Sequence, residues 1–384
     1  MKRIGQRRKN FSLKIKTKAF DFVAFSARVA AFFMGCFLGM GAFLKMAESG
    51  SDFFYYAMAF ARPGSTAAIL SEPFEPEEKP PLSTVFEEEE NGAQNEAQAE
   101  ISAPDEPSEA EKVPPEIPES RRGQVTETQY SASEGGIYVA FGSALIKNCT
   151  SHSAEKIKTK LSESHSLSLS TESRKPQVLI YHTHATEGYE AFDTGVFDVE
   201  NTWRSTDKTE NMVAVGEALS AVLTAKGIGV IHDETLHDDP GYNGSYGRSA
   251  VTIKEHMEEN PSLTVFLDLH RDAIEPSEKE IIKPTAVVNG KKAAQIMIIS
   301  GCDNGKMNMP DYWKNLRFAA ALARCLEELY PGITRPVLFD YRKYNMDLSP
   351  GLLLIEIGAT GNTLEEAKYS AELLGNALVS VLTE

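Results

Sequence analysis

The sequence Val178-Leu-Ile-Tyr-His-Thr-His-Ala-Thr-Glu187 joins a short apolar run to two histidines and a glutamate. Two later, largely apolar runs also end in a polar residue, Leu263–Leu269 at His270 and Leu352–Ile355 at Glu356. Apolar runs of this length predict buried strands. Because the carboxyl ends of strands in an open α/β sheet border one crevice, we expect the polar residues at these three ends to meet there.

From residue 136 onward, segments typical of strands alternate with segments typical of helices. The final helix should begin with a capping box, Thr363-Leu-Glu-Glu366, after which apolar side chains recur at helical spacing. This alternation predicts an α/β fold with a mostly parallel sheet flanked by helices. We expect strands at 137–141, 177–184, 228–232, 263–270, 294–300, 336–340 and 351–357, and helices at 209–226, 246–259, 311–330 and 363–383.

The residues before this region differ from it in composition. Residues 1–21 are basic, which predicts a cytoplasmic tail, and residues 22–46 contain enough apolar side chains for a transmembrane helix. Residues 47–135 include a long acidic tract rich in Pro and Glu, which predicts a disordered linker. We therefore expect a single-pass protein of the cell membrane whose domain at 136–384 is extracytoplasmic. A cleaved signal peptide is the alternative.

The acidic residues are concentrated in one stretch of the chain. The formal net charge is −16, and residues 72–120 carry 16 Asp and Glu against two Lys. The remainder is close to neutral and has no basic patch, which excludes nucleic acid as a partner. The four cysteines are far apart, so they predict neither a cysteine-ligated metal nor a disulfide framework.

The polar residues at the strand ends have the chemistry of a catalytic zinc site. Such a site uses two imidazoles and a carboxylate and leaves one position for water. His184, Glu187 and His270 are therefore the predicted zinc ligands. Two alternative ligands remain open at this stage. Glu210 precedes a predicted helix, and His182 would lie on the same side of an extended strand as His184.

Glu356 interrupts a run of aliphatic residues, where an unpaired carboxylate is costly. We predict that it is the general base, which takes a proton from water and passes it to the leaving amine. Arg271 could bind a substrate carboxylate or an oxyanion. Asp268 or Asp272 could hold the second nitrogen of a ligand histidine. The other histidines are predicted to be surface residues: His152, His165, His232, His237 and His256.

The sequence contains five distinctive blocks: Val178–Glu187, Asn211–Gly216, Tyr242–Ser249, Asp268–Asp272 and Ile355–Glu366. Together these blocks resemble the stage II sporulation protein P family. The resemblance covers about residues 136–384. It implies a zinc-dependent peptidoglycan hydrolase that cuts the amide between N-acetylmuramic acid and the stem peptide during sporulation engulfment, with endopeptidase activity also credited to the family. The implied partners are stage II sporulation proteins D and M, and the implied location is the septal intermembrane space.

The resemblance also bears on the fold and on the ligands. The family's catalytic domain is similar to zinc amidases of the autolysin type, and its residue order is similar to that of zinc carboxypeptidases. The carboxypeptidase likeness favours Glu187 as the third ligand, whereas the autolysin likeness favours Glu210. Arg248 and Asn362 lie in the matching blocks and are expected to bind substrate.

Two other functions remain open at this stage. The first is a zinc peptidase that trims stem peptides or crosslinks of peptidoglycan. The second is a non-enzymatic scaffold that binds the cell wall. The presence of all four residues of the predicted site, His184, Glu187, His270 and Glu356, argues against a scaffold that has lost its catalytic residues.

Overall fold

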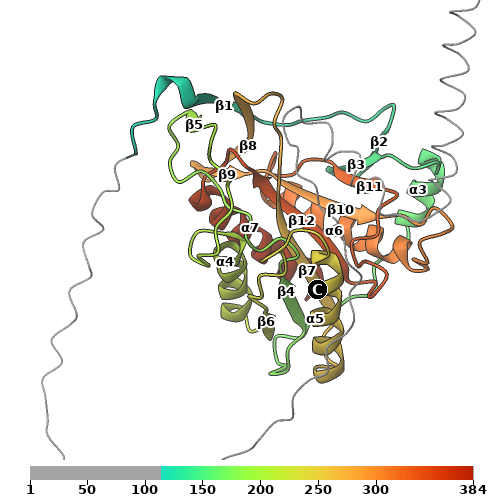
Figure 1. Cartoon of the computed structure of the whole chain (residues 1–384). Coiled ribbons are helices and arrows are strands. Elements are labelled where there is room, and N and C mark those ends of the chain that lie inside the picture. Colours follow the sequence, from blue (N-terminus) through green and yellow to red (C-terminus); the bar gives the residue numbers. More distant parts are fainter. Residues whose placement is uncertain (1–113, 384) are drawn as a thin grey trace, which may run out of the picture. The chain divides into compact units, whose positions relative to one another are not determined.

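The computed structural model describes residues 114–383, which contain two β-sheets and their covering helices (Figure 1). The predicted tail and anchor at 1–46, and the linker up to residue 113, lie outside the described residues. Among residues 114–383, no helix combines the length and the apolar composition that a bilayer crossing requires.

The larger sheet has eight strands in the order β2-β3-β11-β10-β12-β7-β4-β6. Five of its seven strand pairs are parallel, which confirms the mostly parallel sheet expected from the alternation of strands and helices. The antiparallel pairs are β2 with β3 and β10 with β12. The strands are β2 (Tyr138–Phe141), β3 (Ala144–Asn148), β4 (Val178–Tyr181), β6 (Val230–His232), β7 (Val265–Asp272), β10 (Ile296–Gly301), β11 (Val337–Asp340) and β12 (Leu352–Ala359).

The two faces of this sheet are covered by different elements. Alternate side chains of a strand point to opposite faces. Accordingly, Ile180 and Leu267 belong to one hydrophobic cluster, and Tyr181 and Phe266 belong to another. On the first face lie α3 (Ala154–Leu161), α4 (Met212–Ala225), α6 (Tyr312–Leu329) and α7 (Leu364–Leu382), whereas α5 (Ser245–Glu259) covers the second.

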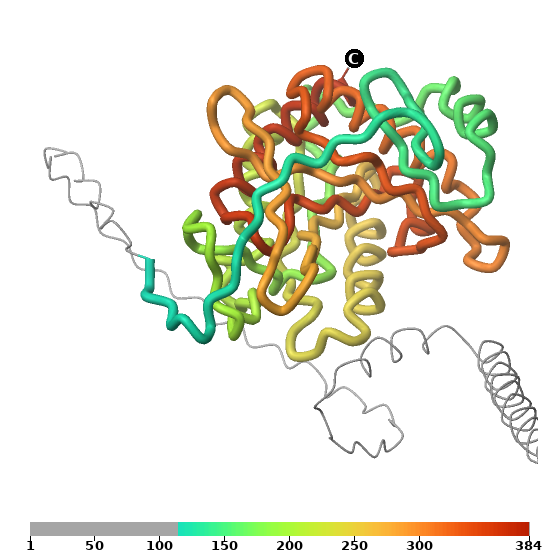
Figure 2. The backbone as a smooth tube through the Cα atoms, turned by 90° about the horizontal axis from the view of Figure 1, so that it is seen from above, coloured from blue at the N-terminus to red at the C-terminus, as the bar shows by residue number. Residues whose placement is uncertain are grey.

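The smaller sheet has the order β5-β1-β8-β9 and was not expected from the sequence. Its strands are β1 (Arg122–Thr128), β5 (Val196–Asp198), β8 (Glu280–Val288) and β9 (Lys291–Ala294). The prediction that the linker continues to residue 135 is wrong at its end, because β1 pairs in parallel with β8. Strand β1 has a polar sequence, and it is held by this pairing and by the Phe197 ring, which occupies the space beside Gly123. Figure 2 shows the stretch that begins with β1, in teal, crossing the domain.

The helices follow their sequence signals closely. Asn211 caps α4 through a side-chain bond to the Val213 N–H, and Thr363 and Glu366 form the expected capping box of α7. Each capping side chain satisfies a backbone N–H that would otherwise lack a partner at a helix start. The predicted helices at 209–226, 246–259, 311–330 and 363–383 correspond to α4, α5, α6 and α7.

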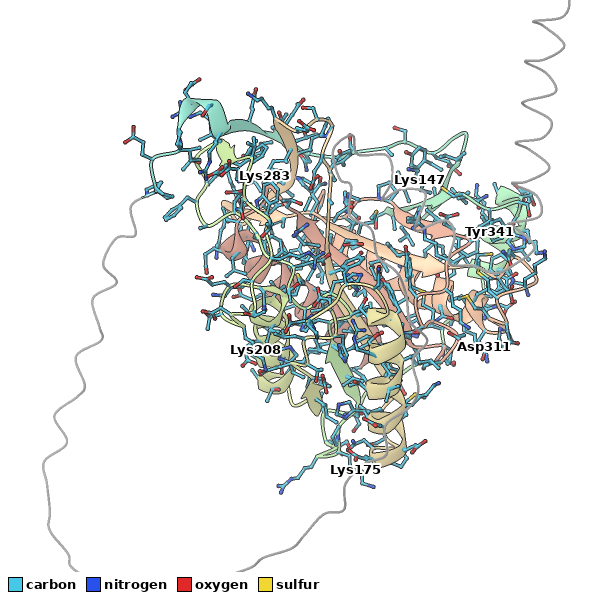
Figure 3. All side chains as sticks on the ribbon, viewed as in Figure 1. Lys147, Lys175, Lys208, Lys283, Asp311 and Tyr341 are labelled. Atoms are coloured by element: carbon cyan, nitrogen blue, oxygen red, sulfur yellow. The ribbon has the colours of Figure 1, made fainter. Side chains whose placement is uncertain are left out.

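Lys283 of β8 is a buried charge between the smaller sheet and the start of α7. Its ammonium lies 2.7 Å from Asp193 and 2.6 Å from Glu366, and its side chain is 1% exposed. Figure 3 labels this residue beside the smaller sheet. An ammonium in such a place is stable only with its carboxylates, and Glu366 in turn depends on the ammonium.

We predict that Lys283→Ala lowers the free energy of unfolding by about 3 kcal/mol, because it leaves the Glu366 carboxylate buried without its cation. Lys292→Ala is the matched control. Lys292 also contacts Asp193, but its side chain is 43% exposed, so its loss should cost less than about 1 kcal/mol. Urea unfolding measures both values, and equal losses would contradict the prediction.

Candidate active site

The three predicted strand ends meet at one edge of the larger sheet. Strands β4, β7 and β12 are neighbours, and His270 of β7 is the register partner of Glu356 of β12. His184 and Glu187 lie in the turn that follows β4. The His184 and His270 rings are 5.2 Å apart between centroids, and His270 Nδ1 is 3.6 Å from Glu187 Oε2. The structure thus brings these four residues together.

Strand β4 ends at Tyr181, three residues earlier than expected. The backbone N–H and the hydroxyl of Thr183 both donate to Asp268, at 2.8 and 2.7 Å, and this turns the chain out of the sheet. We expected His182 and His184 to face the same side because both would lie on an extended strand. This expectation is wrong, since β4 ends before either residue. His182 is fully buried, and its Nε2 lies 2.9 Å from His232 Nε2.

His182 is therefore not a ligand of this site. Burial, followed by the charge of His232, lowers the pKa of His182 to about 3. The prediction that His232 and His237 are surface residues is also wrong. The His237 side chain is buried, with Nδ1 2.8 Å from the His182 carbonyl and Nε2 2.9 Å from the Thr252 hydroxyl.

His184 lies in an aromatic pocket formed with helix α5 and the loop before it. Its ring stacks on Tyr242 at 4.2 Å and meets the edge of Tyr246 at 5.5 Å. Its Nδ1 atom is 3.3 Å from the Ser245 hydroxyl and 3.9 Å from Asp238. Burial, followed by the charge of His270, lowers the pKa of His184 to about 4. The imidazole is therefore neutral near pH 7, which is the form that binds a metal.

His270 lies between two carboxylates. Its Nε2 atom is 3.0 Å from Asp268 Oδ1, although out of line for a hydrogen bond, and its Nδ1 atom faces Glu187. Burial disfavours the charged imidazole, but the two carboxylates outweigh burial and raise the pKa of His270 well above its ordinary value. Of the two aspartates expected to hold a ligand histidine, Asp268 lies beside His270, whereas Asp272 pairs with Arg335 at 2.8 Å.

Glu187 is better placed as the third ligand than Glu210. Burial opposes the charged form of Glu187, but His270 and Arg271 lower its pKa to about 2. Its Oε2 atom accepts a 3.2 Å hydrogen bond from the Arg271 backbone N–H. Glu210 is exposed to solvent just before α4. The geometry therefore favours Glu187.

Glu356 has the environment that its sequence context predicted. Burial raises its pKa to about 8, and the nearby charges of Asp272 and Glu187 add to this, although His270 opposes them. Its Oε2 atom is buried and has no hydrogen-bond partner among residues 114–383. An orphaned carboxyl oxygen with a pKa near neutrality is suited to proton transfer.

The residues His184, Glu187 and His270 fit a zinc ion by their chemistry, since they offer two imidazoles and a carboxylate. Ligand bonds of about 2.0–2.1 Å in a tetrahedral site place two donor atoms roughly 3.4 Å apart. The 3.6 Å between His270 and Glu187 is close to this separation. In the described part of the chain, these three residues do not form a group whose donor atoms all lie within 4.8 Å of one another. Because His270 and Glu187 are already close, an ion would have to draw His184 closer to them.

Arg271 holds the loop that carries Glu187. Its guanidinium donates to the Gly188 carbonyl at 2.5 Å, to the Thr360 hydroxyl at 2.8 Å and to the Trp203 carbonyl at 3.2 Å. The side chain is buried. The predicted contact with substrate is therefore not supported by the geometry, and Arg271 is a positioning residue for Glu187.

Two further residues predicted to bind substrate are engaged in local structure. Asn362 is fully buried, accepts from the Ala359 N–H at 2.9 Å and donates to Glu366 at 3.0 Å. It has no surface to offer a substrate, so that prediction is wrong. Arg248 donates to the carbonyls of His237 and Asn243, at 2.6 and 3.1 Å, and so fixes the loop before α5.

Asp238 and Arg204 were missed by the sequence reasoning. Asp238 is buried and accepts from the Thr186 N–H and hydroxyl, at 3.1 and 2.7 Å. The Arg204 guanidinium lies 2.7 Å from Asp238 and 3.7 Å from Glu187, and it covers the Tyr242 ring at 5.0 Å. Both lie in polar segments without periodicity, so no local pattern distinguished them from loop residues.

Comparisons of sequence show two similarities of this chain to known proteins. A family model described as "Stage II sporulation protein P (SpoIIP)" matches residues 57–379, which include every residue of the site. The "Stage II sporulation protein P" of Bacillus subtilis (strain 168) is 29% identical over 221 residues, which are 55% of this chain and 51% of that protein. The chain thus spans about half the length of the curated relative it matches.

Comparisons of structure give weaker similarities, among them to two amidases. The N-acetylmuramoyl-L-alanine amidase AmiC2 of Nostoc punctiforme is 12% identical, with a TM-score of 0.32, over 54% of this chain and 97% of that chain. The CwlD amidase from Clostridioides difficile, in complex with the GerS lipoprotein, is also 12% identical, with a TM-score of 0.31, over 53% and 95%.

The raised pKa of Glu356 predicts a dependence of stability on pH in the metal-free protein. Between the ordinary pKa of 4.5 and about 8, the folded protein keeps a proton that the unfolded chain releases. Stability therefore falls as the pH rises through this window. Glu356→Gln removes this loss of stability, so the melting temperature of the variant should increase relative to that of wild type as the pH is raised from 5 to 8. Each pKa unit corresponds to about 1.4 kcal/mol.

Calorimetry of the metal-free proteins at the two pH values measures this gain. Glu210→Gln, which removes an exposed carboxyl just before α4, is the control. A constant difference between Glu356→Gln and wild type would contradict the prediction.

Proposed function

The chain belongs to the stage II sporulation protein P family, and from this premise we propose that it is a zinc-dependent peptidoglycan hydrolase acting in sporulation. The proposed reaction is that of an N-acetylmuramoyl-L-alanine amidase, which cleaves the amide between N-acetylmuramic acid and the stem peptide. The observation that carries this proposal is the meeting of His184, Glu187 and His270 beside the orphaned carboxyl of Glu356.

The residues of the site divide into holders of the metal and a proton carrier. His184, Glu187 and His270 would hold zinc, which polarises a carbonyl and lowers the pKa of bound water to about 7. Glu356 takes the proton of the attacking water and delivers it to the leaving amine. The protonated and ionised forms of its carboxyl are close in energy at neutral pH, as its pKa of about 8 indicates.

Asp268 and Asp238 complete the site by acting on the imidazoles. Asp268 faces the second nitrogen of His270, and Asp238 faces that of His184. Such carboxylates orient a ligand histidine and fix its tautomer. The Arg271 backbone N–H donates to the Glu187 carboxylate, and its guanidinium donates to the Gly188 carbonyl and the Thr360 hydroxyl. These bonds keep the Glu187 carboxylate directed at His270.

The cellular setting follows from the family resemblance and the composition of the chain. We include in the proposal an uncleaved membrane anchor at 22–46, an extracytoplasmic domain in the septal space, and stage II sporulation proteins D and M as partners. The acidic linker would let an anchored enzyme reach its polymer. Endopeptidase cleavage of crosslinks is a second activity attributed to the family.

The test of the reaction is mass spectrometry of the products released from purified peptidoglycan by the zinc-loaded protein. Free stem peptides with intact amino termini, matched by peptide-free glycan, are expected for an amidase. Split crosslinks with peptides still attached to glycan would instead establish a peptidase. No release, with zinc content confirmed, would contradict autonomous activity, and no release without bound zinc would favour a wall-binding scaffold.

The assigned roles predict different outcomes for four variants. Glu356→Gln should keep zinc and lose turnover by about 10²–10⁴-fold, because it cannot move the proton. Glu187→Gln and His270→Ala should lose both the active-site zinc and the activity. Glu210→Gln is the matched control and should retain both, since Glu210 is exposed.

Metal analysis and initial rates on the same preparations measure these outcomes. Loss of zinc in Glu210→Gln, with retention in Glu187→Gln, would transfer the ligand role to Glu210. Normal turnover by Glu356→Gln would refute the role of Glu356 as the general base.

A further inference from the structure

A second group of metal-ligating side chains lies on the side of the sheet that α4 covers. It consists of Glu217 on α4, His232 at the end of β6 and Glu234 just beyond it. Within residues 114–383, these form the one group of three such residues whose donor atoms all lie within 4.8 Å of one another. We propose that they bind a second divalent transition metal, of which Zn²⁺ is the first candidate, separate from the active-site ion.

A chain of hydrogen bonds determines which nitrogen of His232 is free. The Leu269 carbonyl can only accept, and it lies 3.3 Å from His182 Nδ1, so this nitrogen carries the proton. His182 Nε2 is then an acceptor, and His232 Nε2, at 2.9 Å, must donate to it. A neutral His232 therefore presents a lone pair at Nδ1, which is the form that binds a metal ion.

The free nitrogen of His232 lies beside the carboxylates of Glu217 and Glu234. This Nδ1 atom is buried, in a side chain that is 6% exposed, and lies 3.5 Å from Glu217 Oε2, and within residues 114–383 it has no hydrogen-bond partner. A lone pair opposed to a carboxylate is unfavourable unless a proton or a metal cation lies between them. An imidazole with two carboxylates is a donor set that suits zinc and related divalent ions.

Two neighbouring charges are already accounted for. Asp233 is paired with His256 at 2.8 Å. The Lys208 ammonium, labelled in Figure 3, lies 3.1 Å from Glu234 Oε2. Both members of that pair are nearly half exposed, so this ion pair is weak. A divalent ion, held also by the imidazole, would displace the ammonium.

The helix is shaped to approach this pair of imidazoles. A Cβ atom at Gly216 would lie 2.4 Å from His232 Nε2 and 2.6 Å from His182 Nε2, so only glycine allows α4 to pass so close. Glu217 is the next residue of the helix. The glycine thus sets the distance between its carboxylate and His232.

An ion at this site would join α4 and β6 and, through His182, the backbone of β7. The carbonyl at the end of the hydrogen-bond chain belongs to Leu269, and the next residue is His270 of the proposed active site. We expect the second ion to have a structural effect, seen as protection against unfolding, because it binds a geometry that the unfolded chain lacks.

The test counts metal ions per chain. Full-length protein is stripped with a chelator, dialysed against buffered Zn²⁺ and analysed for bound metal. Wild type should bind two ions, Glu217→Gln/Glu234→Gln one, and the exposed control pair Glu258→Gln/Glu259→Gln two. The exposed carboxamides should leave the metal-free melting temperature unchanged, which shows that any loss of metal is not a loss of fold.

A variant of the active site separates this proposal from the proposed function. His184→Ala/His270→Ala should still bind one ion, and Zn²⁺ should raise its melting temperature. Adding Glu217→Gln/Glu234→Gln to it should abolish both effects. If Glu217→Gln/Glu234→Gln binds as much Zn²⁺ as wild type, the second site is refuted. If His184→Ala/His270→Ala binds as much Zn²⁺ as wild type while Glu217→Gln/Glu234→Gln binds less, the active-site metal is refuted and the second site is supported.

Discussion

The fully buried carboxylate of Asp268 is the constraint on which the candidate active site depends. It receives two hydrogen bonds from Thr183 and lies 3.0 Å from His270, and these partners keep its pKa below the ordinary value despite burial. The two bonds from Thr183 end β4 and turn the chain toward Glu187. One carboxylate thus both shapes the turn that bears two proposed ligands and orients the histidine of the neighbouring strand.

A second buried aspartate repeats this arrangement on the other side of the site. Asp238 accepts from Thr186 and Arg204 and faces the His184 ring. Each proposed ligand histidine therefore has its own aspartate, and each aspartate is itself held by a threonine of the same turn. Partners of this kind control both the direction and the basicity of a ligand.

The sequence was sufficient to locate His184, Glu187, His270 and Glu356, because each follows or interrupts an apolar strand. Periodicity alone could not place His182, since its direction depends on a bond between Thr183 and Asp268, 85 residues apart. The same limit applies to the smaller sheet. Strand β1 is polar, and its pairing with β8 is a contact between distant segments that leaves no local signal.

The position of β12 in the sheet has a consequence for how the domain opens. The strand lies between β7 and β10, and nearly all of its residues are buried, whereas Tyr242 and Arg248 lie in or beside an exposed loop. Local unfolding begins where few buried contacts hold the backbone and reaches central strands last. The amide of Glu356 should thus exchange with solvent only in the rarest openings, while the exposed loop that contains Tyr242 opens often. A substrate could then be admitted beside this loop without disturbing the proposed general base.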